Sequence, residues 1–176
     1  MFALMFFALR AAAQMLLLYM VTLLAPRGEK DVLFRAELAT AIVEATPDAE
    51  ERLTLARLAK FEAGYRRNVA RCEVKGDKGK SLGEFQIQPI CAPDPAIPCR
   101  DRKLACGSLP EQVGLALRYL RRSAEVCASN VGAAKLNLYT SGRCDHGQAA
   151  SEERWGGQDL ARVPVGDDTE SPHPED

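Results

Sequence analysis

The segment FEAGY, residues 61–65, places a carboxylate where acid–base chemistry is possible. Four residues at helical spacing form one stripe: Leu55, Leu58, Ala59 and Glu62. We therefore expect Glu62 on the buried-side face of a helix, in the last turn, where the helix dipole disfavours negative charge. Desolvation beside Leu58 acts in the same direction, so the protonated form of a general acid is favoured. Alternatively, Glu62 turns outward or pairs with Arg66.

The glycine-rich segment GDKGKSLGEFQIQP, residues 76–89, is the second stretch whose residues could take part in binding or catalysis. Glycine lets the backbone approach a ligand closely, and a glutamine amide supplies both a donor and an acceptor. Such groups suit the hydroxyl and N-acetyl groups of a sugar. Without further context, these residues would equally fit a bulge and a strand surface.

Three separated segments of the chain resemble the goose-type lysozyme and lytic transglycosylase superfamily. The segment EAGY is similar to the E-S-x-G segment that ends the helix bearing the catalytic acid of that family. The segment 76–89 resembles its G-D-x-G…G-L-M-Q-[IV] loop and strand, and LNLYTSG (136–142) resembles its A-Y-N-A-G segment. The order and separation of the three segments fit the family.

The resemblance implies roles for particular residues. It makes Glu62 the catalytic acid, and it gives Asp77 a part in positioning a water molecule. It assigns substrate binding to Ser81, Gly83, Gln86 and Tyr139, with the tyrosine facing the acid across a cleft. It also implies an α+β, predominantly α-helical, lysozyme-like fold with a small strand-containing, glycine-rich excursion and disulfide-stapled loops. No cofactor or metal is required.

The chain departs from the family pattern at several positions. Glu84 replaces the usual apolar residue of G-L-M-Q, which adds a charge to the cleft or faces solvent. Thr140 stands where the asparagine of A-Y-N belongs, and Ala63 replaces the common serine.

The second carboxylate decides between two reactions. An inverting hydrolase needs a second carboxylate to activate water, whereas a lytic transglycosylase uses the C6 hydroxyl of the muramoyl residue and one acid. Asp77 matches one candidate, but Gln88 occupies the position of the other. Asp77 also fits a simple turn residue, and Glu73 and Glu84 have no motif support. The balance favours a transglycosylase.

Helices must position these residues. Their predicted ranges are 31–45, 46–63, 110–127 and 130–139. For the second helix we expect Thr46 as the N-cap, Pro47 in the first turn and Gly64 as the stop. Residues 65–90 form the excursion, in which EFQIQ is a possible short strand. Residues 89–110 are predicted to be an irregular cross-linked loop.

All six cysteines lie in one part of the chain, at Cys72, Cys91, Cys99, Cys106, Cys127 and Cys144. An even number confined to one module predicts up to three disulfides and an oxidising compartment. We expect them to crosslink the loops at 72–110 and 127–144, and the sequence leaves all fifteen pairings open. No CxxC pair occurs, which argues against a zinc site.

The N-terminal residues 1–25 are apolar apart from Arg10 and Gln14. They predict a signal peptide or a membrane anchor, and hence export to the periplasm, the cell envelope or the medium. Residues 26–156 form the predicted lysozyme-like domain, and the acidic tail 157–176 is predicted to be disordered. The chain carries a net charge of −1 and has no dense basic stripe, so nucleic acid is not an expected partner.

These observations leave three hypotheses for the function. The first is a monomeric exported enzyme that cleaves the β-1,4 bond between N-acetylmuramic acid and N-acetylglucosamine in peptidoglycan glycan strands, as a lytic transglycosylase or as a lysozyme. The second is a non-catalytic glycan-binding module on the same fold, favoured by the altered Tyr139–Thr140 segment. The third is a disulfide-rich secreted effector or inhibitor unrelated to glycans.

Overall fold

The protein is predominantly helical in a computed structural model that describes residues 2–20, 32–91, 99–130 and 132–155. The described helices are α1 (Phe2–Tyr19), α2 (Val32–Ala45), α3 (Ala49–Ala63), α4 (Arg67–Ala70), α5 (Arg100–Ala105), α6 (Leu109–Val126), α7 (Asn137–Ser141) and α8 (Gln148–Trp155), with short 3₁₀ turns η3 (Asp77–Gly79) and η4 (Gly132–Leu136). The predicted helical class is confirmed, while the lysozyme-like architecture stays a prediction.

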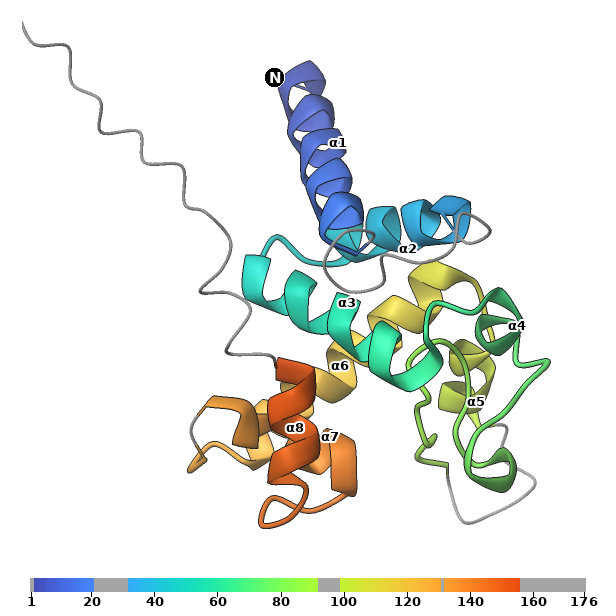
Figure 1. Cartoon of the computed structure of the whole chain (residues 1–176), viewed down its shortest axis with the longest axis vertical. Coiled ribbons are helices and arrows are strands. Elements are labelled where there is room, and N and C mark those ends of the chain that lie inside the picture. Colours follow the sequence, from blue (N-terminus) through green and yellow to red (C-terminus); the bar gives the residue numbers. More distant parts are fainter. Residues whose placement is uncertain (1, 21–31, 92–98, 131, 156–176) are drawn as a thin grey trace, which may run out of the picture.

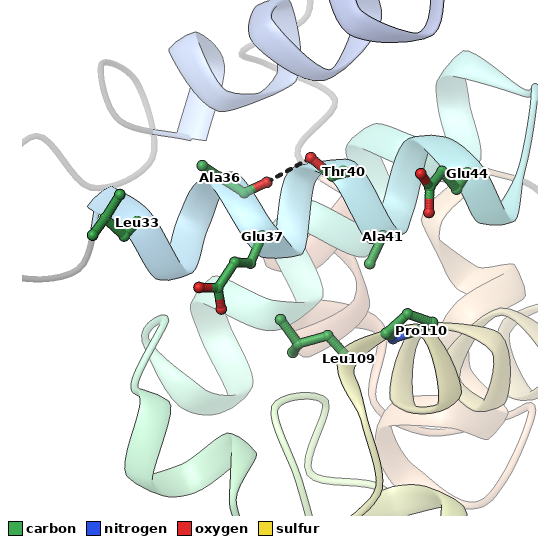
Figure 2. Close-up of a pocket in the computed structure, with 8 residues that line it drawn as sticks. All are labelled: Leu33, Ala36, Glu37, Thr40, Ala41, Glu44, Leu109 and Pro110. Carbon is green, nitrogen blue, oxygen red and sulfur yellow. Dashed lines mark hydrogen bonds between the residues drawn. The ribbon is translucent and has the colours of Figure 1, made fainter. Parts of the chain in front are cut away.

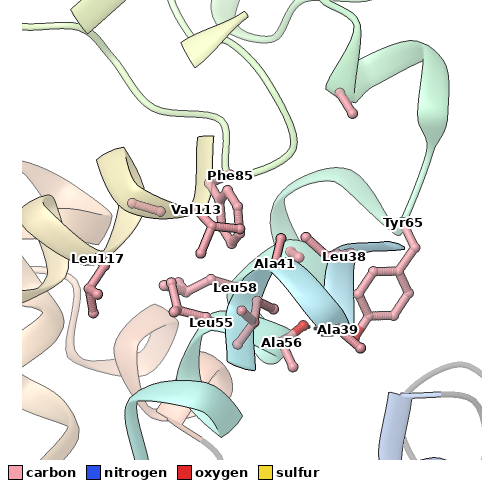
Figure 3. Packing of buried hydrophobic residues seen from close by; sticks show 14 of the residues in the cluster. Leu38, Ala39, Ala41, Leu55, Ala56, Leu58, Tyr65, Phe85, Val113 and Leu117 are labelled. Carbon is pink, nitrogen blue, oxygen red and sulfur yellow. Dashed lines mark hydrogen bonds between the residues drawn. The ribbon is translucent and has the colours of Figure 1, made fainter. Parts of the chain in front are cut away.

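Helix α6 lies at the centre of the fold and contacts α2, α3, α5 and α7 (Figure 1). Its start is fixed by a capping box in which Ser108 and Glu111 bond reciprocally. The apolar stripe predicted from the sequence is buried, at Val113, Ala116, Leu117 and Leu120. Around Val113 the core gathers Leu58 from α3 and Phe85 from the glycine-rich loop (Figure 3). The loop is therefore anchored to the same core as the helices.

Helix α3 confirms the predicted helix 46–63 except at its first residues. The N-cap is Asp48, whose side chain accepts the Glu51 N–H at 2.8 Å, and not Thr46. Thr46 instead donates its hydroxyl to the Glu51 carboxylate. The helix ends as predicted at Gly64, where φ is 65° and the N–H bonds to the Ala59 and Lys60 carbonyls.

The glycine-rich loop, residues 76–88, forms tight turns and not the strand suggested by EFQIQ. Only two isolated bridges occur within it, between Gly76 and Ser81 and between Leu82 and Ile87. The chain cannot run extended through the loop because φ is 71° at Gly83 and 45° at Gln86. The prediction of a strand here was wrong.

Three helices were not predicted, the first being the short α4 at the start of the predicted excursion 65–90. Helix α5 occupies part of the range expected to be irregular, and α8 follows the last predicted helix. The predicted helix 130–139 is replaced in the described residues by η4 and α7, which end at Gly142 with φ of 77°.

Three disulfides staple the loops, as expected from the even number of cysteines. The pairs are Cys72–Cys106, Cys91–Cys99 and Cys127–Cys144. The first encloses the glycine-rich loop, and the last holds the segment between α6 and α8. The disulfides indicate an oxidising compartment, in keeping with export.

Helix α1 packs on α2 through its C-terminal end (Figure 1). Leu16, Tyr19 and Met20 are buried, and the Tyr19 hydroxyl accepts a hydrogen bond from Arg57 at 2.7 Å. In the part of the chain that the structure describes, no helix has the length and apolar character needed to span a membrane. The predicted end of the leader near residue 25 and the acidic tail 157–176 lie outside the described residues.

Candidate functional site

Glu62 lies in the last turn of α3, where its side chain is 19% exposed. The carboxylate accepts a hydrogen bond from Arg154 Nε at 2.6 Å, and the Arg154 side chain is 17% exposed. Arg66, the partner considered from the sequence, instead donates to the Ala63 carbonyl. The sequence therefore predicted correctly that the Glu62 carboxylate lies on a largely covered face, but it did not predict the ion pair with Arg154.

Helix α8 is held in position by contacts with α7. The Thr140 and Ser151 hydroxyls lie 2.9 Å apart and share a hydrogen bond, and Ser151 is fully buried. Upstream, the Cys127–Cys144 disulfide fixes the connecting segment, and the Asn137 side chain donates to the Cys144 carbonyl at 2.9 Å. Thr140, which departs from the family pattern, thus helps to bring Arg154 to Glu62.

Tyr139 connects α7 to the glycine-rich loop. Its hydroxyl donates to the Phe85 carbonyl at 2.9 Å, and its N–H donates to Ser123 Oγ at 3.2 Å. Burial raises the pKa of the Tyr139 phenol well above its usual range, and the negative charge of Glu62 acts in the same direction, against Arg154. The phenol therefore lies within electrostatic reach of the carboxylate.

Gly83 and Gln112 hold the loop against α6. A Cβ atom at Gly83 would lie 2.1 Å from the Ala105 carbonyl oxygen, so only glycine fits. Buried Gln112 accepts the Glu84 N–H at 2.9 Å and donates to the Ala70 and Gly107 carbonyls at 2.8 Å each. Sequence analysis missed Gln112 because a single glutamine in an amphipathic helix looks like a surface residue.

The Gln86 amide turns back into its own loop. Its Nε2 donates to the Gly83 carbonyl at 2.8 Å, and its Oε1 lies where a Cβ of Gly76 would be, at 2.1 Å. Position 76 therefore requires glycine, because the Gln86 side chain approaches the backbone there. The Gln86 amide helps to shape the loop that the sequence resemblance predicts to bind sugar.

Asp77 and Ser81 bond to each other, as the Ser81 hydroxyl donates to the Asp77 carboxylate. Gln88 Nε2 adds a longer bond to the same carboxylate at 3.3 Å. Asp77 is exposed, with φ of 47°. These contacts stay within the loop, which is the arrangement expected of a turn residue, and Ser81 is buried as its partner.

Glu84 is fully buried, so both alternatives considered for it, a charge in the cleft or a residue facing solvent, were wrong. Its charge and those of buried Arg35 and Arg57 all act on the Tyr65 phenol, whose pKa is raised chiefly by burial. Glu73 is exposed and lies 3.9 Å from Arg71.

A cavity of about 670 Å³ lies elsewhere, between α2 and the start of α6 (Figure 2). Leu33, Ala41 and Leu109 give it aliphatic walls, and Glu37 and Glu44 lie at its edge. None of the predicted site residues lines it.

The structure thus brings together Glu62, Tyr139 and the Phe85 end of the glycine-rich loop, adds Arg154, and leaves Asp77 bonded within its turn. In the described residues, no group of three or more histidine, cysteine, aspartate or glutamate side chains is arranged to hold a metal ion. Comparison with protein-family models, with characterised proteins and with solved structures gives no match to this chain.

Proposed function

We propose that the protein is an exported peptidoglycan-cleaving enzyme, a lytic transglycosylase in which Glu62 is the single acid and base. The observation that carries the proposal is the meeting of three segments far apart in the chain. Glu62 at the end of α3 and Tyr139 in α7 lie within electrostatic reach, and Tyr139 bonds the loop at Phe85. These are the segments in which the sequence resembles the family.

In the proposed reaction, the protonated Glu62 donates its proton to the glycosidic oxygen as the bond to C1 of N-acetylmuramic acid breaks. The C6 hydroxyl of the same sugar then attacks C1 and returns a proton to the Glu62 carboxylate. The products are a 1,6-anhydromuramoyl end and a free N-acetylglucosamine hydroxyl, and no water is consumed. Hydrolysis would require a second carboxylate facing the sugar. Asp77 is engaged by Ser81, and Glu84 is buried, which favours the transglycosylase outcome.

Arg154 has to leave Glu62 before proton donation. The Glu62 oxygen that accepts the 2.6 Å bond from Arg154 Nε is occupied by that contact and cannot approach a glycosidic oxygen at the same time. Binding of the glycan between α8 and the loop would separate the pair. The same contact favours the second candidate, a non-catalytic glycan-binding module in which Glu62 and Arg154 form a structural ion pair.

Mass spectrometry of soluble products tests the proposal. The full chain, folded with its disulfides, is incubated with purified peptidoglycan from several bacteria, beside Glu62→Gln and the matched control Glu50→Gln in the exposed first turn of α3. Anhydromuramoyl products that disappear only in Glu62→Gln support a transglycosylase. Reducing ends with the same dependence identify a lysozyme. Retention of the protein on peptidoglycan without any product supports the binding module.

A further inference from the structure

A second cavity, of about 190 Å³, lies where α5, α6 and the end of the glycine-rich segment meet. It is lined by Ile90, Asp101, Arg118, Tyr119 and Arg122. Ile90 follows the loop, Asp101 belongs to α5, and the other three lie on one stretch of α6. No residue assigned above to the candidate site lines this cavity.

The single carboxylate of the cavity is already engaged. Asp101 accepts hydrogen bonds from Arg118 and from the Tyr119 hydroxyl, each at 2.7 Å. The Tyr119 oxygen in turn accepts the Ile90 N–H at 2.9 Å. Burial and the bond to Asp101 raise the pKa of Tyr119 to about 12, so its phenol stays neutral at physiological pH. These bonds give the cavity a defined floor.

The cavity carries an excess of positive charge. Arg122 lies one helical turn after Arg118 on α6 and is exposed. It makes no hydrogen bond or ion pair with the residues that the structure describes, while the Arg118 side chain remains 50% exposed beside Asp101. The cavity lining thus contains two arginines and one carboxylate, beside the exposed apolar side chain of Ile90. An arginine pair of this kind suits a carboxylate ligand, which it can bind by paired N–H donors.

The cavity adjoins the candidate site through two tyrosines. The Tyr119 phenol is close enough to the Tyr139 phenol to raise its pKa, and Glu62 acts on the same phenol. Geometry also connects the two, because the Tyr139 hydroxyl bonds the Phe85 carbonyl and, five residues further along the same segment, the Ile90 N–H bonds the Tyr119 oxygen, each at 2.9 Å. The cavity therefore lies beside the segment that the proposed function assigns to glycan binding.

We propose that this cavity binds a free carboxylate of the acidic peptide carried by the N-acetylmuramic acid residue, with Arg122 as the main ligand and Arg118 as the second. This inference rests on the proposed function and deepens it, because it names the peptide-substituted strand as the preferred substrate. The apolar surface of Ile90 packs against aliphatic parts of the peptide, and Asp101 holds Arg118 in place.

Cleavage kinetics on two substrates test the inference. One is soluble glycan strands with their peptides, and the other is the same strands after an amidase has removed the peptides. Arg122→Gln is compared with Arg102→Gln, an exposed arginine of α5 that does not line the cavity. We expect Arg122→Gln to raise KM about tenfold on the peptide-bearing strands, with kcat unchanged, because one charge-assisted contact is lost. On the denuded strands it should change neither constant.

A binding measurement separates this inference from the proposed function. Calorimetry of the full chain carrying Glu62→Gln, with the free peptide L-Ala-D-Glu-L-Lys as the probe and its fully amidated form as control, reports the cavity without catalysis. We expect binding of the acidic probe, weakened about tenfold by Arg122→Gln and abolished by amidation. Absence of binding overturns the peptide site even if cleavage is observed. Binding without any cleavage by the unmodified enzyme overturns the proposed function and leaves the site standing.

Discussion

At the scale of single residues, the contact between Glu62 and Arg154 determines how the candidate acid behaves. Both side chains are largely covered, and the bond between them is short, at 2.6 Å. A hydrogen bond between charged groups contributes about 1.5–3 kcal/mol when solvent is mostly excluded. This contact therefore competes directly with a substrate for the Glu62 carboxylate, and glycan binding has to offset it.

Replacing Arg154 by glutamine should increase the cleavage rate at neutral pH by about tenfold, because about 1.4 kcal/mol of the competing interaction is removed. The measurement is the initial rate of release of anhydromuramoyl products. Arg143→Gln is the matched control, since that arginine pairs with exposed Asp145. A loss of activity as complete as in Glu62→Gln would instead make Arg154 part of the catalytic machinery.

At the scale of secondary-structure elements, the glycine-rich loop takes its shape from α6. Gln112 is the link, with three hydrogen bonds to the loop at Glu84, to the end of α4 at Ala70 and to Gly107. Tyr139 holds the other side of the loop through Phe85. The loop is therefore fixed by two long-range polar contacts and by its own tight turns.

Gln112→Leu should lower the free energy of unfolding by about 3 kcal/mol, because a side chain of similar size leaves three buried polar groups without their partner. Urea denaturation followed by circular dichroism measures this change. Gln88→Leu on the exposed side of the loop should change it by less than about 0.5 kcal/mol. Equal effects of the two substitutions would show that Gln112 does not hold the loop.

Local signals predicted some of these elements and not others. An apolar stripe indicated α3 and α6, and a glycine stop indicated the end of α3, because both signals depend on neighbouring residues. Helix α8 has no clear apolar stripe. It is fixed by Ser151, whose partner Thr140 lies 11 residues away, and by Arg154, whose partner Glu62 lies 92 residues away. The alternation of apolar and polar residues in EFQIQ predicts a strand. The positive φ at Gln86 is set by packing of the loop, which local sequence does not reveal.

At the scale of the whole molecule, a buried polar cluster ties the loop to the helices. Glu84 from the loop, Arg35 from α2, Arg57 from α3 and Tyr19 from α1 all act on the phenol of Tyr65. Arg57 bonds Tyr19, and Arg35 lies 5.3 Å from the centre of the Tyr65 ring. The candidate site consequently rests on a core to which α1 contributes.

The three disulfides constrain this arrangement to different degrees. In the chain-entropy model, a crosslink stabilises more when it closes a longer loop in the unfolded chain. The sequence separations are 34 residues for Cys72–Cys106, 17 for Cys127–Cys144 and 8 for Cys91–Cys99. Replacing each pair by alanines should lower the free energy of unfolding by about 4, 3 and 2.5 kcal/mol respectively.

Urea denaturation of the three paired variants measures this order, with the four remaining cysteines of each variant shown to be oxidised. The Cys72–Cys106 variant should also lose cleavage activity most strongly, because that crosslink encloses the whole glycine-rich loop between α4 and α5. The Cys91–Cys99 crosslink closes the shortest loop. The variant that lacks it should keep cleavage activity and lose the least stability. If it lost as much stability as the Cys72–Cys106 variant, loop length would not govern the contribution of these crosslinks. The stabilisation would then come from contacts that each disulfide makes in the folded state.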